Sequence, residues 1–246
     1  MANFYITKDM INGSSVIITG DEEAHISRVL RMKKGDEVTL CDGEGMFYDA
    51  VLECFDAKSV TARITKKYCA PTEPKVRITI YQGVPKNPKL ETIVQKATEI
   101  GVAKIVPVDS VRTVAKLDKP QKLERLRRIA YEAAKQSKRG ILPQVGEVLS
   151  FEEAIQEAKK ADVAIIPYEE EKECSIKKAL QGKKPETIAI MIGPEGGFEK
   201  SEVEFAVKNS ITPVTLGTRI LRTETAGVIV SGIALYEYDE MQCKDR

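Results

Sequence analysis

The sequence predicts an α/β protein built of two parts, a small β-barrel and a larger domain with a mostly parallel sheet. Short strand-length runs separated by turn signals occupy residues 1–70. A segment with two prolines follows at 71–74, and after it apolar strand-length runs alternate with helix-length segments. Such alternation is typical of parallel strands covered by helices. We therefore expect one domain over 1–70 and a second over 75–246.

The first part is predicted to hold short strands and one helix. Thr19 and Glu22 have the spacing of a capping box, which predicts a helix over 21–30. Turn signals at Gly35-Asp36 and Asp42-Gly43 separate the neighbouring strands. The expected strands are 14–18, 46–53 and 59–65.

The second part is predicted to alternate strands and helices. A helix over 88–100 has Pro88 in its first turn and Gly101 as its stop. Ser201 and Glu204 have the spacing of a second capping box. The expected strands are 76–82, 104–108, 163–166, 187–192 and 213–216, with 141–145 left open. The other expected helices are 120–138, 151–161, 201–209 and 224–240.

The last of these helices is apolar on nearly every side between Ala226 and Tyr238. A helix of this kind has to be covered all round. It therefore lies deep in its own domain or packs against another subunit, and we favour a homodimer.

Composition excludes several classes of protein. The 246 residues include 38 basic and 37 acidic ones, and this balance neither indicates nor excludes nucleic acid as a partner. Five cysteines without a C-x-x-C pair and a single histidine argue against a disulfide framework, a histidine-based triad and a metal site. We find no signal peptide and no apolar run of membrane-spanning length, so we expect a cytoplasmic protein without a metal.

Two glycine-bearing loops each follow a predicted strand, at 193–198 and 216–225. The first lacks the Gly-Lys-Ser/Thr of a P-loop and the G-x-G-x-x-G spacing of a dinucleotide site, and by itself it is equally compatible with a structural turn. The second mixes apolar residues with two arginines and a carboxylate, which suits a ligand pocket. Ligands of open α/β sheets bind where such loops meet, so we place the active site here.

A basic segment lies between Lys119 and Arg139, with eight basic and two acidic residues. A local charge of +6 is typical of a phosphate-binding surface. A solvated helix face is the alternative interpretation.

Four segments, in this order along the chain, resemble the RsmE family of ribosomal RNA uridine-N3 methyltransferases, which belongs to the SPOUT superfamily. They are His25 with Val29-Leu30-Arg31 and Gly35-Asp36; 95–102; 132–137 with Arg139 and Pro143; and 192–198 together with 216–226. Two positions depart from the family pattern, Asn3 in place of a basic residue and Lys138 in place of a small one.

The resemblance implies a PUA-like, RNA-binding barrel over 1–70 and a SPOUT methyltransferase domain over 75–246 with a C-terminal trefoil knot, a feature otherwise almost absent from proteins. It also implies an obligate homodimer and S-adenosyl-L-methionine as the methyl donor. Its expected substrate is a uridine in small-subunit (16S) ribosomal RNA, within the assembled subunit.

The resemblance assigns roles to residues of both loops. Ile220 and Leu221 are expected to sandwich the adenine, and Arg222 to lie beside the methyl donor or the target nucleotide, unless it forms a salt bridge to Glu224 or Glu195. The expected cofactor-binding residues are Gly193, Glu195, Gly196, Leu216, Gly217, Ile220, Leu221 and Arg222.

Uracil N3 carries a proton that has to leave, so a general base or an arginine that stabilises the anion would assist. Arg222 and Glu224 are the expected catalytic residues, and Glu195 and Glu99 are the other candidate carboxylates. The expected RNA-binding residues are His25, Arg31, Lys86, Gln136, Ser137 and Arg139, with a packed or capping His25 as the alternative.

Three other functions compete with this hypothesis. A SPOUT methyltransferase for transfer RNA or another ribosomal nucleotide would share every motif. A non-enzymatic RNA-binding assembly factor would use the barrel and the basic segment, but it has no need of bare glycine loops. A Rossmann-type nucleotide enzyme lacks its fingerprint.

Overall fold

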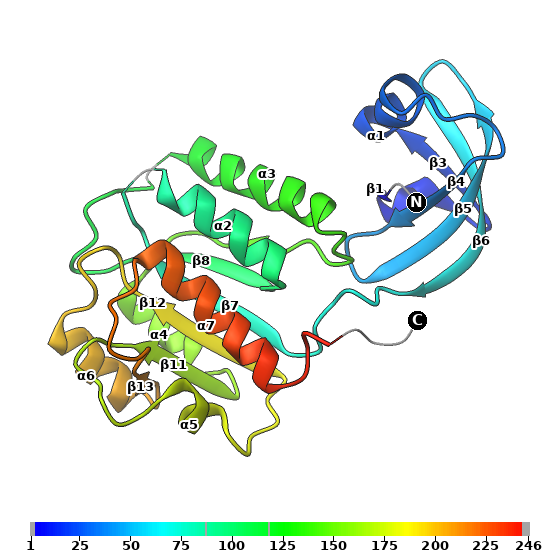
Figure 1. The fold of residues 1–246 in the computed structure, drawn as a ribbon. Helices are drawn as coiled ribbons and strands as arrows, with labels where there is room; N and C mark the ends of the chain where they lie inside the picture. The colour runs from blue at the N-terminus through cyan, green and yellow to red at the C-terminus, as the bar shows by residue number, and fades with distance from the viewer. Residues whose placement is uncertain (1–2, 87, 118, 243–246) are drawn as a thin grey trace. The chain divides into compact units, whose positions relative to one another are not determined.

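The computed structural model describes residues 3–86, 88–117 and 119–242, and the chain divides into two compact units (Figure 1). The first unit contains residues up to 73 together with 134–142. Of the described residues, the second contains 74–133 and 143–242. A short segment from the middle of the sequence therefore belongs to the N-terminal unit.

The first unit is a curled six-stranded sheet, with the strands in the order β1-β4-β5-β6-β3-β2 (Figure 1). Large apolar side chains, among them Phe4, Ile18, Leu40 and Leu52, point into the curl and are fully buried. The strands are β1 (Asn3–Tyr5), β2 (Ile11–Asn12), β3 (Ser15–Thr19), β4 (Glu37–Cys41), β5 (Met46–Phe55) and β6 (Ser59–Cys69).

The predicted helix of this unit is present in two pieces, α1 (Gly20–Ala24) and a π-helical turn (His25–Val29). The predicted capping box is wrong, because Thr19 makes no side-chain hydrogen bond to the helix. Glu22 has another partner instead: its carboxylate accepts hydrogen bonds from Lys135 Nζ at 2.7 and 2.9 Å.

The proline-containing segment after β6 is fixed by a buried ion pair. The Glu73 carboxylate accepts hydrogen bonds from Arg139 Nη2 at 2.7 Å and from the Gly140 N–H at 2.7 Å. The side chains of Arg139 and Glu73 are 4% and 10% exposed. Breaking a buried pair by removing one partner typically costs about 3–5 kcal/mol, so this contact ties 134–142 to the first unit.

The second unit is a parallel seven-stranded sheet in the order β10-β8-β7-β12-β11-β13, with β9 beside β8, which confirms the predicted α/β class. The strands are β7 (Arg77–Gly83), β8 (Lys104–Asp109), β9 (Gln144–Val145), β10 (Leu149–Ser150), β11 (Val163–Pro167), β12 (Thr187–Ile192) and β13 (Thr212–Val214). The helices are α2 (Lys89–Ile100), α3 (Pro120–Gln136), α4 (Phe151–Ala158), α5 (Ile176–Leu180), α6 (Lys200–Lys208) and α7 (Thr223–Glu237).

Alternate residues of these strands face two separate apolar cores. Ile80 and Ile190 pack beneath α2, α3, α5 and α7 on one face, whereas Tyr81 and Met191 pack beneath α4 and α6 on the other. Each fully buried side chain of this size contributes roughly 1.5–3 kcal/mol. Burial on both faces explains why the strands appear in the sequence as continuous apolar runs.

The start of α6 differs from the prediction. The helix begins at Lys200 after Glu199, and the Glu199 N–H donates to Glu202 Oε2 at 2.8 Å. The Ser201–Glu204 capping box is therefore wrong, and both residues are exposed. The Glu202 carboxylate caps the start of α6 by accepting the Glu199 N–H. Glu202 faces inward, and its carboxylate also accepts the Val111 N–H at 3.0 Å.

The apolar C-terminal helix α7 is covered on one side in the single chain. Ala226, Val230 and Ala234 are buried against the sheet and α2. Ile229 and Ile233 remain 44% and 40% exposed, which leaves the predicted second subunit as a proposal.

Candidate functional site

The predicted site lies where the strand order of the second unit reverses. The chain places β8 on one side of β7, while β12 lies on the other side of β7 and separates it from β11. The loops that leave β7 and β12 therefore start side by side at the carboxyl edge of the sheet. These are the loops that begin at Val84 and Gly193.

Glycines allow close contact between the end of β7 and the loop that follows β12. A Cβ on Gly83 would lie 2.6 Å from Pro194 Cδ and 2.7 Å from Pro194 N. A Cβ on Gly193 would lie 2.9 Å from the carbonyl carbon of Gly197, which itself has a φ of +68°. The first glycine loop, 193–198, is thus folded tightly on itself and on the end of β7.

Polar contacts hold the outside of this loop. Arg112 Nη1 donates to the Gly196 carbonyl at 2.7 Å. The Glu195 carboxylate accepts the Lys86 N–H at 3.1 Å and lies 3.1 Å from Lys89 Nζ. The loops after β7, β8 and β12 are therefore linked through their polar groups.

A buried hydrogen-bond network joins the first loop to the start of α7. The Thr223 hydroxyl donates to the Gly193 carbonyl at 2.6 Å. Gln82 Nε2 donates to Thr223 Oγ1 and to the Gly83 carbonyl, both at 2.9 Å. Gln82 is fully buried, so this network fixes the N-terminus of α7 against the ends of β7 and β12.

The second glycine loop is open over 216–222, whereas the remainder of the predicted loop, 223–225, forms the first turn of α7. Gly217 has a φ of +92°, and a Cβ at that position would meet nothing within 4 Å. None of the main-chain N–H groups of 218–221 donates a hydrogen bond to another described residue. Ile220 is 89% exposed, whereas Leu216 and Leu221 pack partly against the core.

Of the charged residues predicted to take part in catalysis, Arg222 and Glu224 lie at the proposed site, whereas Glu99 lies far from it. Glu224 Oε2 lies 3.4 Å from Lys89 Nζ, and Glu224 Oε1 lies 4.0 Å from Arg222 Nη1. The Arg222 side chain is 82% exposed. Glu99 pairs with Lys96 in the last turn of α2, about 15 Å along the helix from Lys89, so it does not join the site.

The pKa of Glu195 is lowered. Burial alone would raise this pKa, but hydrogen bonds from the backbone and from Lys89, together with the Lys89 charge, outweigh burial. Glu195 is therefore held as a carboxylate and is a weak proton acceptor near neutral pH.

The arrangement fits an adenosine-containing ligand. Unpaired main-chain donors beside half-buried leucines suit a flat apolar ring with a polar edge. The space above Gly217, which a side chain would occupy, leaves the backbone open to close approach.

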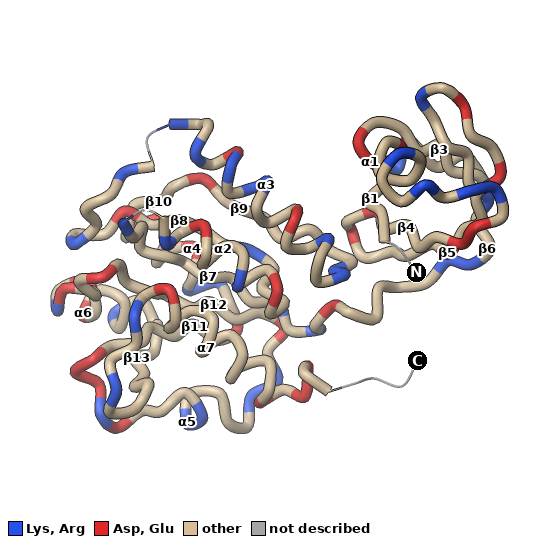
Figure 2. The backbone as a smooth tube through the Cα atoms, turned by 45° about the horizontal axis from the view of Figure 1, so that its top comes forward, with Lys and Arg blue, Asp and Glu red and all other residues tan. Residues whose placement is uncertain are grey.

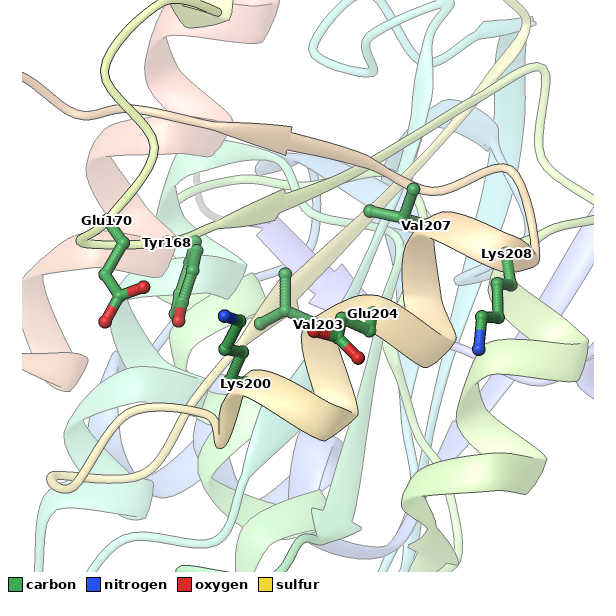
Figure 3. Close-up of a pocket in the computed structure, with 7 residues that line it drawn as sticks. All are labelled: Tyr168, Glu170, Lys200, Val203, Glu204, Val207 and Lys208. Carbon is green, nitrogen blue, oxygen red and sulfur yellow. The ribbon is translucent and has the colours of Figure 1, made fainter.

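A separate surface cavity of about 320 Å³ lies along α6, and Figure 3 shows its lining side chains. That cavity includes none of the predicted site residues.

The predicted RNA-binding residues differ in how accessible they are. Arg31, Lys86 and Gln136 are exposed. His25 is half-buried, packs edge-on against Phe4 and lies beside Lys135, which agrees with the packed alternative. Ser137 is half-buried, and Arg139 is committed to Glu73.

Figure 2 shows the Lys and Arg positions along α3, and ion pairs partly neutralise their charge. Arg125 pairs with Glu91, and Arg127 pairs with Glu147 at 2.6 Å. The local charge of +6 therefore overstates the number of cations available to phosphate.

Four residues of the site were not named among the predicted site residues, although Thr223 lies within the predicted loop 216–225. They are Gln82, Lys89, Arg112 and Thr223. Gln82 carried a usable signal, because it is a polar residue at the carboxyl end of a predicted strand, where α/β sheets bind ligands. The partners of the other three depend on tertiary contacts that spacing does not contain.

Comparison with known proteins identifies the class of this chain. Residues 72–235 match the model of an RNA methyltransferase domain, and residues 18–65 match that of an RNA methyltransferase PUA domain. The first match covers more than half of the chain, so the chain belongs to the RNA methyltransferase family.

Relatives specify the branch of that family. The chain is 34% identical to ribosomal RNA small subunit methyltransferase E of Bacillus subtilis, over 94% of each protein. A Neisseria gonorrhoeae structure of the same enzyme, bound to S-adenosyl methionine, has a TM-score of 0.84 at 28% identity and covers 96% of this chain and 97% of its own. A probable rRNA methyltransferase from Porphyromonas gingivalis also has a TM-score of 0.84, at 32% identity, covering 98% and 100%. The chain is a member of the RsmE family, as the resemblance predicted.

Two further properties concern the part of the chain that the structure describes. It contains no helix with the length and apolar character needed to cross a membrane. Within the same residues, no group of three or more His, Cys, Asp or Glu side chains could hold a metal ion.

Proposed function

We propose that this protein transfers a methyl group from S-adenosyl-L-methionine to N3 of a uridine in small-subunit (16S) ribosomal RNA. Family membership supports the reaction class, and the names of the relatives support the small-subunit RNA substrate. The observation that carries the proposal is the 2.6 Å hydrogen bond from Thr223 to Gly193, which joins the first glycine loop to the start of α7, directly after the second loop, at the sheet's switch point.

The cofactor would lie between these loops. Its sulfonium supplies an activated methyl group, and the protein supplies alignment. Unpaired N–H groups of 218–221 would donate to the adenine edge. The residues proposed to hold the cofactor are Gly193, Glu195, Gly196, Leu216, Gly217, Ile220, Leu221 and Arg222.

Two charged side chains are proposed to assist the transfer. Glu224 would accept the N3 proton, and Arg222 would stabilise the negative charge that develops on uracil. Of the two carboxylates at the loops, Glu224 suits this role better, because the lowered pKa of Glu195 reflects the bonds that engage it in holding its loop.

The uracil N3 position normally takes part in base pairing, so the target nucleotide would be unpaired or flipped out. Exposed Arg31, Lys86 and Gln136 are proposed to contact the RNA, with His25 and Ser137 at the margin. Arg139 would act indirectly, because its ion pair with Glu73 fixes the segment that follows α3.

Four broader features complete the proposal. The first domain, which spans 1–70 and is joined by 134–142, binds RNA, and the second spans 75–246 apart from that segment and ends in a trefoil knot. The protein is cytoplasmic and acts on the assembled small subunit. The exposed apolar side chains of α7, Ile229, Ile233 and Tyr236, support a homodimer in which a second copy covers that stripe.

The test is a transfer assay with labelled cofactor and small ribosomal subunits from a strain that lacks the modification. Digestion of the RNA to nucleosides should show label in 3-methyluridine. Label in another nucleoside would reject the base assignment, and no transfer to RNA would reject the proposal as a whole.

A further inference from the structure

One cation, that of Lys89, lies between the first glycine loop and the start of α7, directly after the second loop. Lys89 occupies the first turn of α2, and its Nζ lies 3.1 Å from Glu195 Oε1 and 3.4 Å from Glu224 Oε2. Glu195 belongs to the first loop, and Glu224 follows the second loop in the first turn of α7. A single ammonium group therefore contacts one carboxylate from each side of the proposed cofactor site.

The three side chains are partly shielded from water. Lys89 is 31% exposed, Glu195 is 32% exposed and Glu224 is 22% exposed. Glu224 Oε2 is buried and accepts no hydrogen bond from any residue that the structure describes, so the nearby ammonium charge is its main compensation. Without that charge, two carboxylates would face each other across a gap that water screens incompletely.

Other cations near the site do not substitute for Lys89. Lys86 reaches Glu195 through its main-chain N–H, and Arg222 lies 4.0 Å from Glu224 on a largely exposed side chain. Among the ion pairs of the described residues, only those of Lys89 join both carboxylates.

We propose that Lys89 is a positioning residue that holds the two loops at the separation the cofactor requires. This inference rests on the proposed function, because it assigns the gap between the loops to S-adenosyl-L-methionine. Lys89 touches neither reacting atom in this role. It acts through Glu195 and Glu224, and its loss changes the distance between the loops.

The hydrogen-bond network of Gln82 and Thr223 makes this role specific. That network already fixes the base of α7 against Gly193 in the protein interior. Lys89 acts further out, where the loops are exposed. Its removal should therefore leave the fold intact and affect ligand binding.

The experiment compares Lys89→Met with Lys89→Arg and Lys96→Met in the full-length protein. Lys96→Met is the matched control, because Lys96 lies on the same helix and pairs with Glu99, outside the site. Calorimetry with S-adenosyl-L-methionine should show about tenfold weaker binding for Lys89→Met, near-normal binding for Lys89→Arg and no change for Lys96→Met.

A second variant separates positioning from folding. In Lys89→Met/Glu195→Gln, the repulsion between the carboxylates is absent. Because glutamine keeps the size and one acceptor oxygen of Glu195, cofactor affinity should recover in part relative to Lys89→Met alone. The KM for cofactor should follow the same order, while the KM for RNA stays constant. Wild-type affinity in Lys89→Met, or no recovery in the double variant, would overturn the inference.

The same measurements distinguish the inference from the proposed function. If the wild-type protein binds the cofactor and Lys89→Met binds it more weakly, the inference stands even when no RNA is methylated. If the wild-type protein does not bind the cofactor, both are overturned.

Discussion

The two glycine loops have opposite surroundings. The first, 193–198, is crowded by its own chain: the missing side chains of Gly83 and Gly193 leave just enough room for Pro194 and Gly197. The second, 216–222, is open: Gly217 has free space where a side chain would be, and Arg222 and Ile220 extend into solvent.

This difference shows that glycine serves two purposes in one site. In the first loop glycine permits contact between protein segments, which gives one side of the proposed site a tightly packed wall. In the second it permits a left-handed backbone, and the product is a stretch of unpaired main-chain donors available to a ligand. Substitutions in the first loop should therefore act on folding and binding together, and those in the second mainly on function.

The largest expected effect is that of Arg222→Ala in the open loop. Its exposed guanidinium has one distant partner, so the free energy of unfolding should change by less than about 0.5 kcal/mol. Loss of a group that stabilises developing charge should lower kcat roughly 10²–10³-fold. Steady-state kinetics and thermal unfolding measure the two effects.

Arg219→Ala is the matched control, because Arg219 is an exposed arginine of the same loop. It should retain near wild-type kcat. Equal losses in the two variants would point to general attraction of RNA by positive charge.

Gly193→Ala in the crowded loop should have the next largest effect, on both stability and cofactor binding. The new Cβ would lie 2.9 Å from a backbone carbon that cannot move freely, and such overpacking typically costs about 1–3 kcal/mol. We expect a lower melting temperature and little measurable cofactor binding.

Gly196→Ala provides the comparison within the same loop. Its Cβ would lie 3.3 Å from the flexible side chain of Arg112, which can shift. Its melting temperature should fall less than that of Gly193→Ala. The opposite order would show that crowding does not determine the shape of this loop.

Thr223→Val tests the connection between the loops. Valine keeps the shape but removes the donor to Gly193 and the acceptor for Gln82, leaving buried polar groups unpaired at a cost of about 1–3 kcal/mol. Thr225→Val, an exposed substitution on the same helix, should be nearly neutral. Chemical denaturation measures both, and equal stability of the two variants would contradict the role of the network.

Much of the fold is predictable from local pattern. The strand over 187–192 matches β12, because burial on both faces makes its apolar run continuous. Gly101 ends α2 with a φ of 108°, as a glycine stop should. The start of α6 could not be predicted this way, because Glu202 caps it from an inward-facing position that only tertiary packing defines.

The position of the site was predictable in part, because it also follows from local pattern. Loop positions follow from strand ends, so both glycine loops were expected together. The burial of Arg139 was not, because its partner Glu73 lies 66 residues away in the sequence. Lys89 was missed because a single lysine at a helix start carries no local signal of two carboxylates beside it.

Among the site variants, Gly217→Ala should have the smallest effect on function and the most informative one. Alanine at a φ of +92° is strained by roughly 1–2 kcal/mol, although its Cβ meets no atom within 4 Å. The open loop can relieve this strain by shifting, so the cost in stability is limited, but the unpaired N–H groups of 218–221 shift with it.

Gly182→Ala is the matched control, because Gly182 has a φ of +75° and equally open surroundings at the end of α5. Both variants should lose similar stability in chemical denaturation, whereas only Gly217→Ala should weaken cofactor binding, by about three- to tenfold in calorimetry, since only its loop lies at the switch point. Unchanged cofactor affinity in Gly217→Ala would mean that the ligand does not use this stretch of main chain, and the contrast between a rigid wall and an open one would lose its functional meaning.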